Sequence, residues 1–300
     1  MEAWLITDEQ YRGLIESRAR RPGAIAEAAQ ARKRRDHLDD GTGLLIVAAD
    51  HSGRGVISAG GEPLAIGQRR NLLDRIITAL EHPAVDGVMA TADIVEELLW
   101  LGALEDKIVI GSMNRSGLVG SAWELDDRFN CYDTAGIVDS GLDGGKMLMR
   151  VDLEDPASNP TIAACGEAVS ELARAQVMAL VEPLPYSRHG GRLQLTTELE
   201  AMIRTISVAS ALGSTSAFTW LKLPAVDRME EVMAATSLPT LLLGGDPGAH
   251  PESVYEQWRQ ALAIPHVRGL VAGRPILYPP DGDITAVVNL VAEMMGRQVV

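Results

Sequence analysis

The stretch Leu44-Leu-Ile-Val-Ala-Ala-Asp-His51 decides the fold. Its apolar residues follow a break at Gly41-Thr-Gly43, and such a run is typical of a fully buried strand in a parallel sheet. Similar runs alternate with helical patterns along the chain. We expect strands near residues 44–49, 85–90, 107–111, 146–151, 177–183, 218–223, 240–244 and 269–272. We expect helices near residues 67–81, 92–101, 133–140, 160–175, 195–211, 226–235, 252–263 and 283–295.

Strands and helices that alternate without an intervening linker predict an α/β fold, a (β/α)8 TIM barrel. The length of 300 residues suits one barrel, which commonly takes about 250. Because amphipathic helical patterns over 9–20 and 24–37 precede it, we predict an N-terminal helical extension over 1–40 and a barrel domain over 41–300. The alternative is a doubly wound sheet. However, no Gly-x-Gly-x-x-Gly follows the first strand, as a dinucleotide-binding fold would require.

One long connection, residues 112–132, interrupts this alternation. Long loops in compact barrels are often functional or contribute to packing. The pattern leaves open whether this loop covers an active site or contacts another subunit.

The charge and the cysteine content restrict the class of protein. A net charge of −14 argues against nucleic acid as the main partner, because phosphates favour clustered Lys and Arg. An anionic substrate would therefore need local basic groups. Cys131 and Cys165 have no metal-ligand spacing, which is consistent with reduced thiols in the cytoplasm. The N-terminal residues lack the pattern of a signal peptide, and no apolar run is long enough to span a membrane.

Lysine is scarce: only four of the 27 basic residues are Lys, and two of these lie in apolar, strand-like runs. Lys222 lies within Phe218-Thr-Trp-Leu-Lys-Leu-Pro224, and Lys146 opens Lys146-Met-Leu-Met-Arg-Val-Asp152. Since the composition prefers arginine for surface charge, a lysine in a buried strand needs a chemical reason. Lysine, unlike arginine, can lose its proton when desolvated and attack a carbonyl. The pattern therefore indicates an enzyme that forms a Schiff base.

Polar residues and glycines stand at the C-terminal ends of the predicted strands, where a barrel places its reactive groups. Besides the two lysines, these positions hold, in chain order, Asp50, His51, Glu182, Gly244, Gly245, Gly273 and Arg274. Carboxylates can move protons, and glycine-rich strand ends followed by helices can bind phosphate through backbone N–H groups. Each group also has a structural interpretation. A lysine can lie at a strand edge or start, an aspartate can cap a loop, and an arginine can be a surface charge.

These residues resemble a known group of enzymes. The chain is similar to class I aldolases of the DeoC/LacD and archaeal fructose-bisphosphate aldolase type. It looks closest to the deoxyribose-phosphate-aldolase-like barrel proteins of actinobacterial inositol-catabolism clusters. The resemblance covers roughly residues 44–295. Its anchors are Ile46-Val-Ala-Ala-Asp-His51, Lys146-Met-Leu-Met149, Val181-Glu-Pro-Leu-Pro-Tyr186, Trp220-Leu-Lys-Leu223 and Leu241-Leu-Leu-Gly-Gly-Asp246.

The resemblance implies roles for the catalytic residues. Lys222 matches the Schiff-base lysine, and Lys146 the second lysine of the tagatose-bisphosphate branch. Glu182 matches the proton-shuttling glutamate of that branch, whereas Tyr186-Ser-Arg188 is similar to the Tyr-Pro-Arg-Gly of the archaeal branch, whose tyrosine handles the proton. The acid/base therefore stays open between Glu182 and Tyr186. We expect Asp50 to orient a hydroxyl or to assist imine formation.

The resemblance also implies a substrate and a site for its phosphate. We expect substrate and phosphate contacts from His51, Arg188, Gly244, Gly245, Gly273 and Arg274, although Pro275 replaces the usual Asn of the family's Gly-Arg pattern. The expected reaction is metal-independent cleavage of a ketose phosphate, with no cofactor. The resemblance suggests 2-deoxy-5-keto-gluconate 6-phosphate, while fructose or tagatose bisphosphate and sulfofructose phosphate remain open. We expect a homo-oligomer in the cytoplasm, with no nucleic-acid or membrane partner.

Two other classes of function remain as alternatives. A metal-dependent aldolase would need two or three histidines around zinc, but the sequence has no His-x-His or His-x3-His pair. A non-catalytic barrel that binds a sugar phosphate is the second alternative. It predicts that Lys222 has an ordinary pKa and cannot be trapped as an imine.

Overall fold

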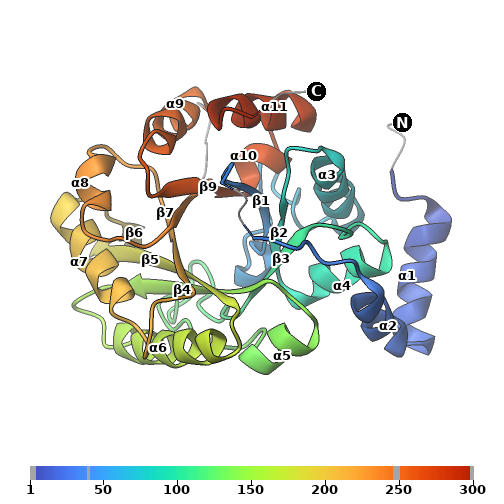
Figure 1. Cartoon of the computed structure of the whole chain (residues 1–300), viewed down its shortest axis with the longest axis horizontal. Helices are drawn as coiled ribbons and strands as arrows, with labels where there is room; N and C mark the ends of the chain where they lie inside the picture. Colours follow the sequence, from blue (N-terminus) through green and yellow to red (C-terminus); the bar gives the residue numbers. More distant parts are fainter. Residues whose placement is uncertain (1–4, 39–40, 246–250, 298–300) are drawn as a thin grey trace.

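The apolar runs of the sequence form the strands of a closed parallel barrel, which helices surround (Figure 1). The computed structural model describes residues 5–38, 41–245 and 251–297. The strands are β1 (Leu44–Ala49), β2 (Gly87–Ala90), β3 (Ile108–Ser112), β4 (Gly144–Val151), β5 (Met178–His189), β6 (Arg192–Leu195), β7 (Thr219–Leu223), β8 (Thr240–Leu243) and β9 (Val267–Ala272). The helices are α1 (Asp8–Arg20), α2 (Gly23–Ala31), η1 (Ser52–Arg54), α3 (Arg69–Glu81), α4 (Ala92–Trp100), α5 (Thr134–Asp139), α6 (Ser158–Arg174), α7 (Leu199–Ser210), α8 (Met229–Met233), α9 (Pro251–Leu262), α10 (Arg274–Leu277) and α11 (Ile284–Met294).

Strand pairing closes the barrel. The strands follow the order β4-β3-β2-β1-β9-β8-β7-β5-β6, and an additional pairing of β4 with β5 joins the two ends of the parallel part. The eight parallel strands therefore form a (β/α)8 TIM barrel, as predicted from the alternation of elements. The open, doubly wound sheet is excluded, because such a sheet would leave β4 and β5 as separate edges.

Side chains of β1 alternate between the barrel interior and the helical layer. Leu44, Ile46 and Ala48 belong to an interior cluster with residues from the other strands. Leu45 and Val47 belong to the larger core between strands and helices. Both faces of the strand are thus buried, which explains why the run is continuously apolar.

The N-terminal helices lie outside the barrel, beside α4 (Figure 1). Thr7 caps α1 through a capping box with Gln10, and Arg18 forms an ion pair with Glu96 of α4 at 2.9 Å. The helix expected over 24–37 ends earlier, at Ala31.

The early end of α2 has a physical reason in Arg32. Its guanidinium is buried and donates to the carbonyl oxygens of Lys107 at 2.8 Å and Gly141 at 2.7 Å. The chain leaves the helix to reach these loops, and the partly buried Leu38 packs against the interior cluster of the barrel. The boundary between the N-terminal extension and the barrel domain at residues 40 and 41 stays a prediction. Residues 1–4, 39–40 and 298–300 of these two regions lie outside the described residues.

The sequence prediction was wrong about the region after residue 183. Strand β5 continues to His189, and the antiparallel strand β6 pairs with it from Tyr186 onwards. The turn between them is Gly190-Gly191, with φ angles of 58° and 79°, and two such residues fit a tight hairpin turn. Helix α7 accordingly begins at Leu199 rather than at 195.

An irregularity in β9 needs a glycine. Thr240 pairs with Val267 but Leu242 pairs with Leu270, so β9 holds one more residue than β8 over this interval, a β-bulge. Gly269 lies in the bulge with φ of 124°, and a Cβ there would lie 2.0 Å from the carbonyl oxygen of Leu44. Any side chain at 269 would therefore push β9 away from β1.

We predict that Gly269→Ala destabilises the barrel by about 3 kcal/mol or more, because it combines an unfavourable φ with a clash against backbone. Gly166→Ala is the matched control, since it lies inside α6 and a Cβ there meets nothing closer than 3.8 Å. That change should raise the free energy of unfolding by about 0.5–1 kcal/mol. Urea denaturation of both variants measures the difference. Equal stabilities would show that β9 tolerates a side chain at 269.

Candidate active site

Two lysines point into the barrel because of the strand register. Lys146 of β4 pairs with Leu180 of β5, and Lys222 of β7 pairs with Leu241 of β8. Both leucines belong to the interior cluster, and directly paired residues of neighbouring strands face the same side. Lys146 is the third residue of β4 rather than its first, so the alternative of an exposed strand start does not hold.

The carboxylate of Glu182 lies between the two lysines. Lys222 Nζ donates to Oε1 of Glu182 at 2.7 Å, and Lys146 Nζ forms an ion pair with Oε2. All three side chains are buried: 0% of Lys146, 8% of Lys222 and 9% of Glu182 is exposed. Since Glu182 lies inside β5 and not at its end, the neighbouring strands hold it among the lysines.

A second carboxylate, Asp50, extends the cluster toward β1 and β3. Lys146 Nζ lies 3.6 Å from Oδ2 of Asp50, and the hydroxyl of Ser112 donates to the same oxygen at 2.6 Å. The guanidinium of Arg115 also forms an ion pair with Asp50. Arg115 is only 4% exposed, so the cluster contains three basic and two acidic side chains in the barrel interior.

Burial and charge shift the pKa values of these groups. Burial lowers the pKa of Lys222, and the negative charge of Glu182 opposes that shift. Burial also lowers the pKa of Lys146, and the nearby charge of Arg115 adds to the effect. Burial would raise the pKa of Glu182, but the charges of Lys146 and Lys222 outweigh it, so this pKa is lowered. A carboxylate beside lysines that release protons readily is a setting for covalent chemistry with a carbonyl.

The ends of β8 and β9 bring His51, Gly244 and Gly273 together. A Cβ on Gly273 would lie 2.4 Å from the imidazole of His51, and a Cβ on Gly244 would lie 3.1 Å from Pro275. Position 273 therefore requires glycine, and a side chain at 244 would be tightly packed. Burial and the charge of Arg274 lower the pKa of His51 to about 3, which keeps its ring neutral. Gly245 follows with φ of 63° and is the last described residue before a gap.

Tyr186 and Arg188 lie farther along β5, on the part that forms the hairpin with β6. The guanidinium of Arg150 lies over the Tyr186 ring at 5.6 Å from its centre, and burial raises the pKa of the phenol. Arg188 instead forms an ion pair with Asp155 at 2.9 Å, and 44% of its side chain is exposed. The structure therefore brings Tyr186 near the cluster but places Arg188 at the surface.

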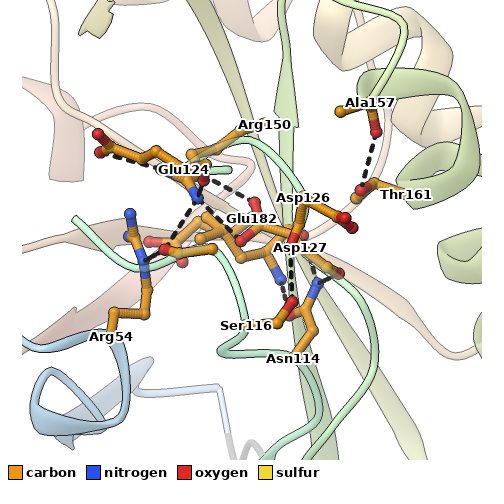
Figure 2. Close-up of polar contacts among 12 residues, drawn as sticks. Arg54, Asn114, Ser116, Glu124, Asp126, Asp127, Arg150, Ala157, Thr161 and Glu182 are labelled. Atoms are coloured by element: carbon orange, nitrogen blue, oxygen red, sulfur yellow. Dashed lines mark hydrogen bonds and ion pairs between the residues drawn. The ribbon is translucent and has the colours of Figure 1, made fainter. Parts of the chain in front are cut away.

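The long connection after β3 contacts Arg54, which follows β1, and Arg150 near the end of β4, and we call residues 113–133 the cover loop. Figure 2 shows how Arg150, from β4, holds it. Arg150 donates to both oxygens of Asp127, at 2.8 and 2.9 Å, and neither side chain is exposed. Asn114 further donates to the carbonyl oxygen of Leu148 at 2.7 Å. These contacts favour the role of an active-site cover; contact with another subunit remains untested.

Sequence reasoning missed Ser112, Arg115 and Arg150. The alternation of strand side chains could have found two of them, because Ser112 follows the inward Ile110 by two positions and Arg150 follows Lys146 by four. Arg115 comes from the cover loop, and no periodicity predicts the direction of a loop side chain.

Within residues 5–38, 41–245 and 251–297, no three His, Cys, Asp or Glu side chains gather as a metal ion would require. No helix in the described parts of the chain is long and apolar enough to cross a membrane.

Comparison with solved structures supports the barrel fold. The crystal structure of Cgl0159 from Corynebacterium glutamicum matches 98% of this chain and 99% of its own, with a TM-score of 0.94 and 42% identity. An archaeal fructose-1,6-bisphosphate aldolase, with its catalytic Lys bound to the carbinolamine intermediate, matches 90% of this chain and 99% of its own. Its TM-score is 0.66 and its identity 15%.

A fructose-bisphosphate aldolase from Slackia heliotrinireducens covers 97% of this chain and 87% of its own, with a TM-score of 0.62 and 13% identity. At such identities the likeness to the two aldolases shows a shared fold. No curated protein has a significantly similar sequence. The profile of the Cgl0159-like family matches residues 42–292, which is most of the barrel. Together with the 42% identity to Cgl0159, this match shows that the chain belongs to the Cgl0159-like family.

Proposed function

We propose that this protein is a class I aldolase that cleaves a ketose phosphate through a Schiff base on Lys222. The observation that carries the proposal is the pair of buried lysines, Lys146 and Lys222, on the single carboxylate of Glu182. The shared fold with the archaeal aldolase is consistent with it.

Charge balance supports Lys222 as the nucleophile. With all groups ionised, Arg115, Lys146 and Lys222 exceed Asp50 and Glu182 by one positive charge in a buried site. Arginine keeps its proton in proteins, so the proton that the site gives up comes from a lysine. Lys146 contacts two carboxylates, whereas Lys222 contacts one. Lys222 is also the more exposed of the two, which a substrate carbonyl needs in order to reach it.

The reaction then proceeds in balanced steps. The neutral amine of Lys222 attacks the ketone, and loss of water leaves a protonated imine. A base removes the proton from the hydroxyl two carbons away, and the electrons of the bond between that carbon and the intervening one move into the imine. The aldehyde leaves, the enamine takes up a proton, and water releases the second product. Glu182 is our choice of base because its Oε1 lies 2.7 Å from Lys222 Nζ; Tyr186 is the alternative.

Other residues orient the substrate in this proposal. Asp50, held by Ser112, would align a hydroxyl or assist imine formation and hydrolysis. Gly244, Gly245, Gly273 and Arg274 would bind the phosphate at the ends of β8 and β9, where barrels often build such a site.

We propose 2-deoxy-5-keto-gluconate 6-phosphate as the substrate, cleaved to malonate semialdehyde and dihydroxyacetone phosphate. The resemblance to barrel proteins of inositol-catabolism clusters supports this choice. Fructose or tagatose bisphosphate and sulfofructose phosphate are the alternative substrates, and a non-catalytic sugar-phosphate-binding barrel is the alternative function. Release of triose phosphate from a panel of these ketoses distinguishes them.

Borohydride with dihydroxyacetone phosphate should add one substrate-derived mass to the protein, at Lys222. Lys222→Arg should keep the fold and lose both the adduct and the cleavage activity, because a guanidinium stays protonated. Peptide mass spectrometry locates the modified residue, and Lys33→Arg, at an exposed lysine, is the control for the substitution. An adduct on Lys146 would reverse the two roles, and no adduct would favour a non-catalytic barrel.

Glu182→Gln should slow carbon–carbon cleavage about 100-fold or more, the usual scale for a positioned acid/base. The negative charge of Glu182 raises the pKa of Lys222 against the effect of burial, so its removal should lower that pKa further. Imine formation requires neutral Lys222 and therefore increases as pH rises through this pKa. In Glu182→Gln the increase should move to lower pH, as single-turnover trapping at several pH values would show. If Glu182→Gln cleaves the substrate almost as fast as the native protein and Tyr186→Phe is inactive, the proton transfer belongs to Tyr186.

Arg274→Ala should raise KM for the phosphorylated ketose about 10-fold or more, because a charge-assisted contact contributes roughly 1.5–3 kcal/mol. Cleavage of an unphosphorylated analogue should change little. Arg188→Ala tests the other predicted phosphate contact, whose guanidinium the structure pairs with Asp155. Steady-state kinetics on both ketoses measures the effect. Equal losses on the two substrates would mean that Arg274 supports the barrel and not the phosphate.

A further inference from the structure

Arg54 places a positive charge at the mouth of the barrel, beneath the cover loop. It ends η1, directly after β1, and its Nε donates to the carbonyl oxygen of Gly117 at 3.2 Å. Its own carbonyl oxygen accepts from the N–H of Val119 at 3.1 Å. Figure 2 shows the Arg54 side chain extending toward Arg150 and the two acidic residues that contact it, Glu124 and Asp127. The cover loop therefore fixes the backbone and the Nε of Arg54 and leaves the two terminal nitrogens of the fork for another group.

The carboxylates near Arg54 already have other partners. Asp127 accepts two hydrogen bonds from Arg150. Glu124 contacts Arg150 through Oε1 at 3.4 Å and accepts from the N–H of Gly120 through Oε2 at 2.9 Å. Within the described residues, no carboxylate forms an ion pair with Arg54. A partly buried cation without a counterion is unfavourable, and a bound anion would relieve that cost.

The charge of Arg54 acts on the reaction centre. Burial is the main cause that lowers the pKa of Lys222, and Arg54 contributes to the same shift. Burial raises the pKa of Tyr186, and Arg54 opposes that change. Lys222 lies on β7, between β5 on one side and β8 on the other. The carbonyl oxygen of Gly117 accepts from both Arg54 and Arg150, and Arg150 lies over the Tyr186 ring of β5, so Arg54 reaches the β5 side through the cover loop. A substrate at Lys222 would then extend toward Arg54 on that side and toward the β8–β9 glycines on the other.

We propose that Arg54 binds a carboxylate on the part of the substrate that leaves as the aldehyde; this inference rests on the proposed aldolase function. A guanidinium fork matches the two oxygens of a planar carboxylate. The nearby carboxylates of Asp127 and Glu124 would repel a phosphate dianion more strongly than a singly charged carboxylate. The geometry thus points to a phosphorylated keto acid as the substrate class.

The test uses the reverse reaction, with dihydroxyacetone phosphate as donor and three acceptor aldehydes. These are malonate semialdehyde, its uncharged methyl ester and glyceraldehyde 3-phosphate. The native protein should use malonate semialdehyde at least about 10-fold better, in kcat/KM, than either of the others. Arg54→Met, which keeps the apolar stem, should remove the advantage over the ester, so that the ratio of kcat/KM for the acid to kcat/KM for the ester falls to about one. Arg128→Met is the matched control, because Arg128 lies on the cover loop that contacts Arg54 and 79% of its side chain is exposed.

Three results would overturn the proposal: preference for glyceraldehyde 3-phosphate, equal use of the acid and its ester, or equal losses on both in Arg54→Met. Borohydride trapping of dihydroxyacetone phosphate in Arg54→Met separates this failure from failure of the aldolase function, since Lys222 should still be labelled. Calorimetry with propionate, which carries a single carboxylate, gives a readout that needs no catalysis. Binding should weaken about 10-fold in Arg54→Met and persist in Lys222→Arg, and equal binding by native protein and Arg54→Met would contradict the inference.

Discussion

The carboxylate of Glu182, shared by Lys146 and Lys222, is the interaction on which the site depends. Each of these charges is costly to bury alone, and each is tolerated because the others lie beside it. Neighbouring parallel strands supply the arrangement: β4 and β7 flank β5, so both lysines meet Glu182 from opposite sides. An open sheet with the same strands would separate β4 from β5. Closure of the barrel is therefore a condition for the proposed chemistry as well as for the fold.

Arg115 makes the charge balance of this cluster unequal. Because Arg115 keeps its proton, the two carboxylates can balance only one of the two lysines as well. Its position also links the site to the cover loop, which the buried Arg150–Asp127 pair holds on the barrel. Removal of Asp127 alone would leave Arg150 buried without its main partner, a change that commonly costs several kcal/mol. The loop thus contributes a positive charge to the cluster around Glu182 through Arg115.

Different features of the sequence predicted the barrel and the residues that the structure brings together in its interior, Asp50, Lys146, Glu182 and Lys222. Continuous apolar runs identify strands buried on both faces, and the rarity of lysine drew attention to Lys146 and Lys222. The hairpin of β5 and β6 was missed because the expected strand ended at 183 and the expected helix began at 195, so the Gly190-Gly191 turn was left in the connection between them. Arg54 and Arg115 were missed because their directions depend on loop conformations that contacts far along the chain determine. The alternation along a strand predicts the side to which each side chain points, whereas a loop has no such alternation.

The net charge of −14 and an anionic substrate are compatible because the two act over different distances. At physiological ionic strength the field of a surface carboxylate is screened within about 8 Å, so most of the acidic surface has little effect inside the barrel. In the interior the balance is reversed, since Arg115, Lys146 and Lys222 outnumber Asp50 and Glu182. Low dielectric strengthens these local charges relative to the distant ones. A substrate anion is therefore repelled only weakly on approach, and in our proposal it meets a positive cluster beneath the cover loop as long as Lys222 keeps its proton. Loss of that proton makes Lys222 the nucleophile and leaves the cluster balanced.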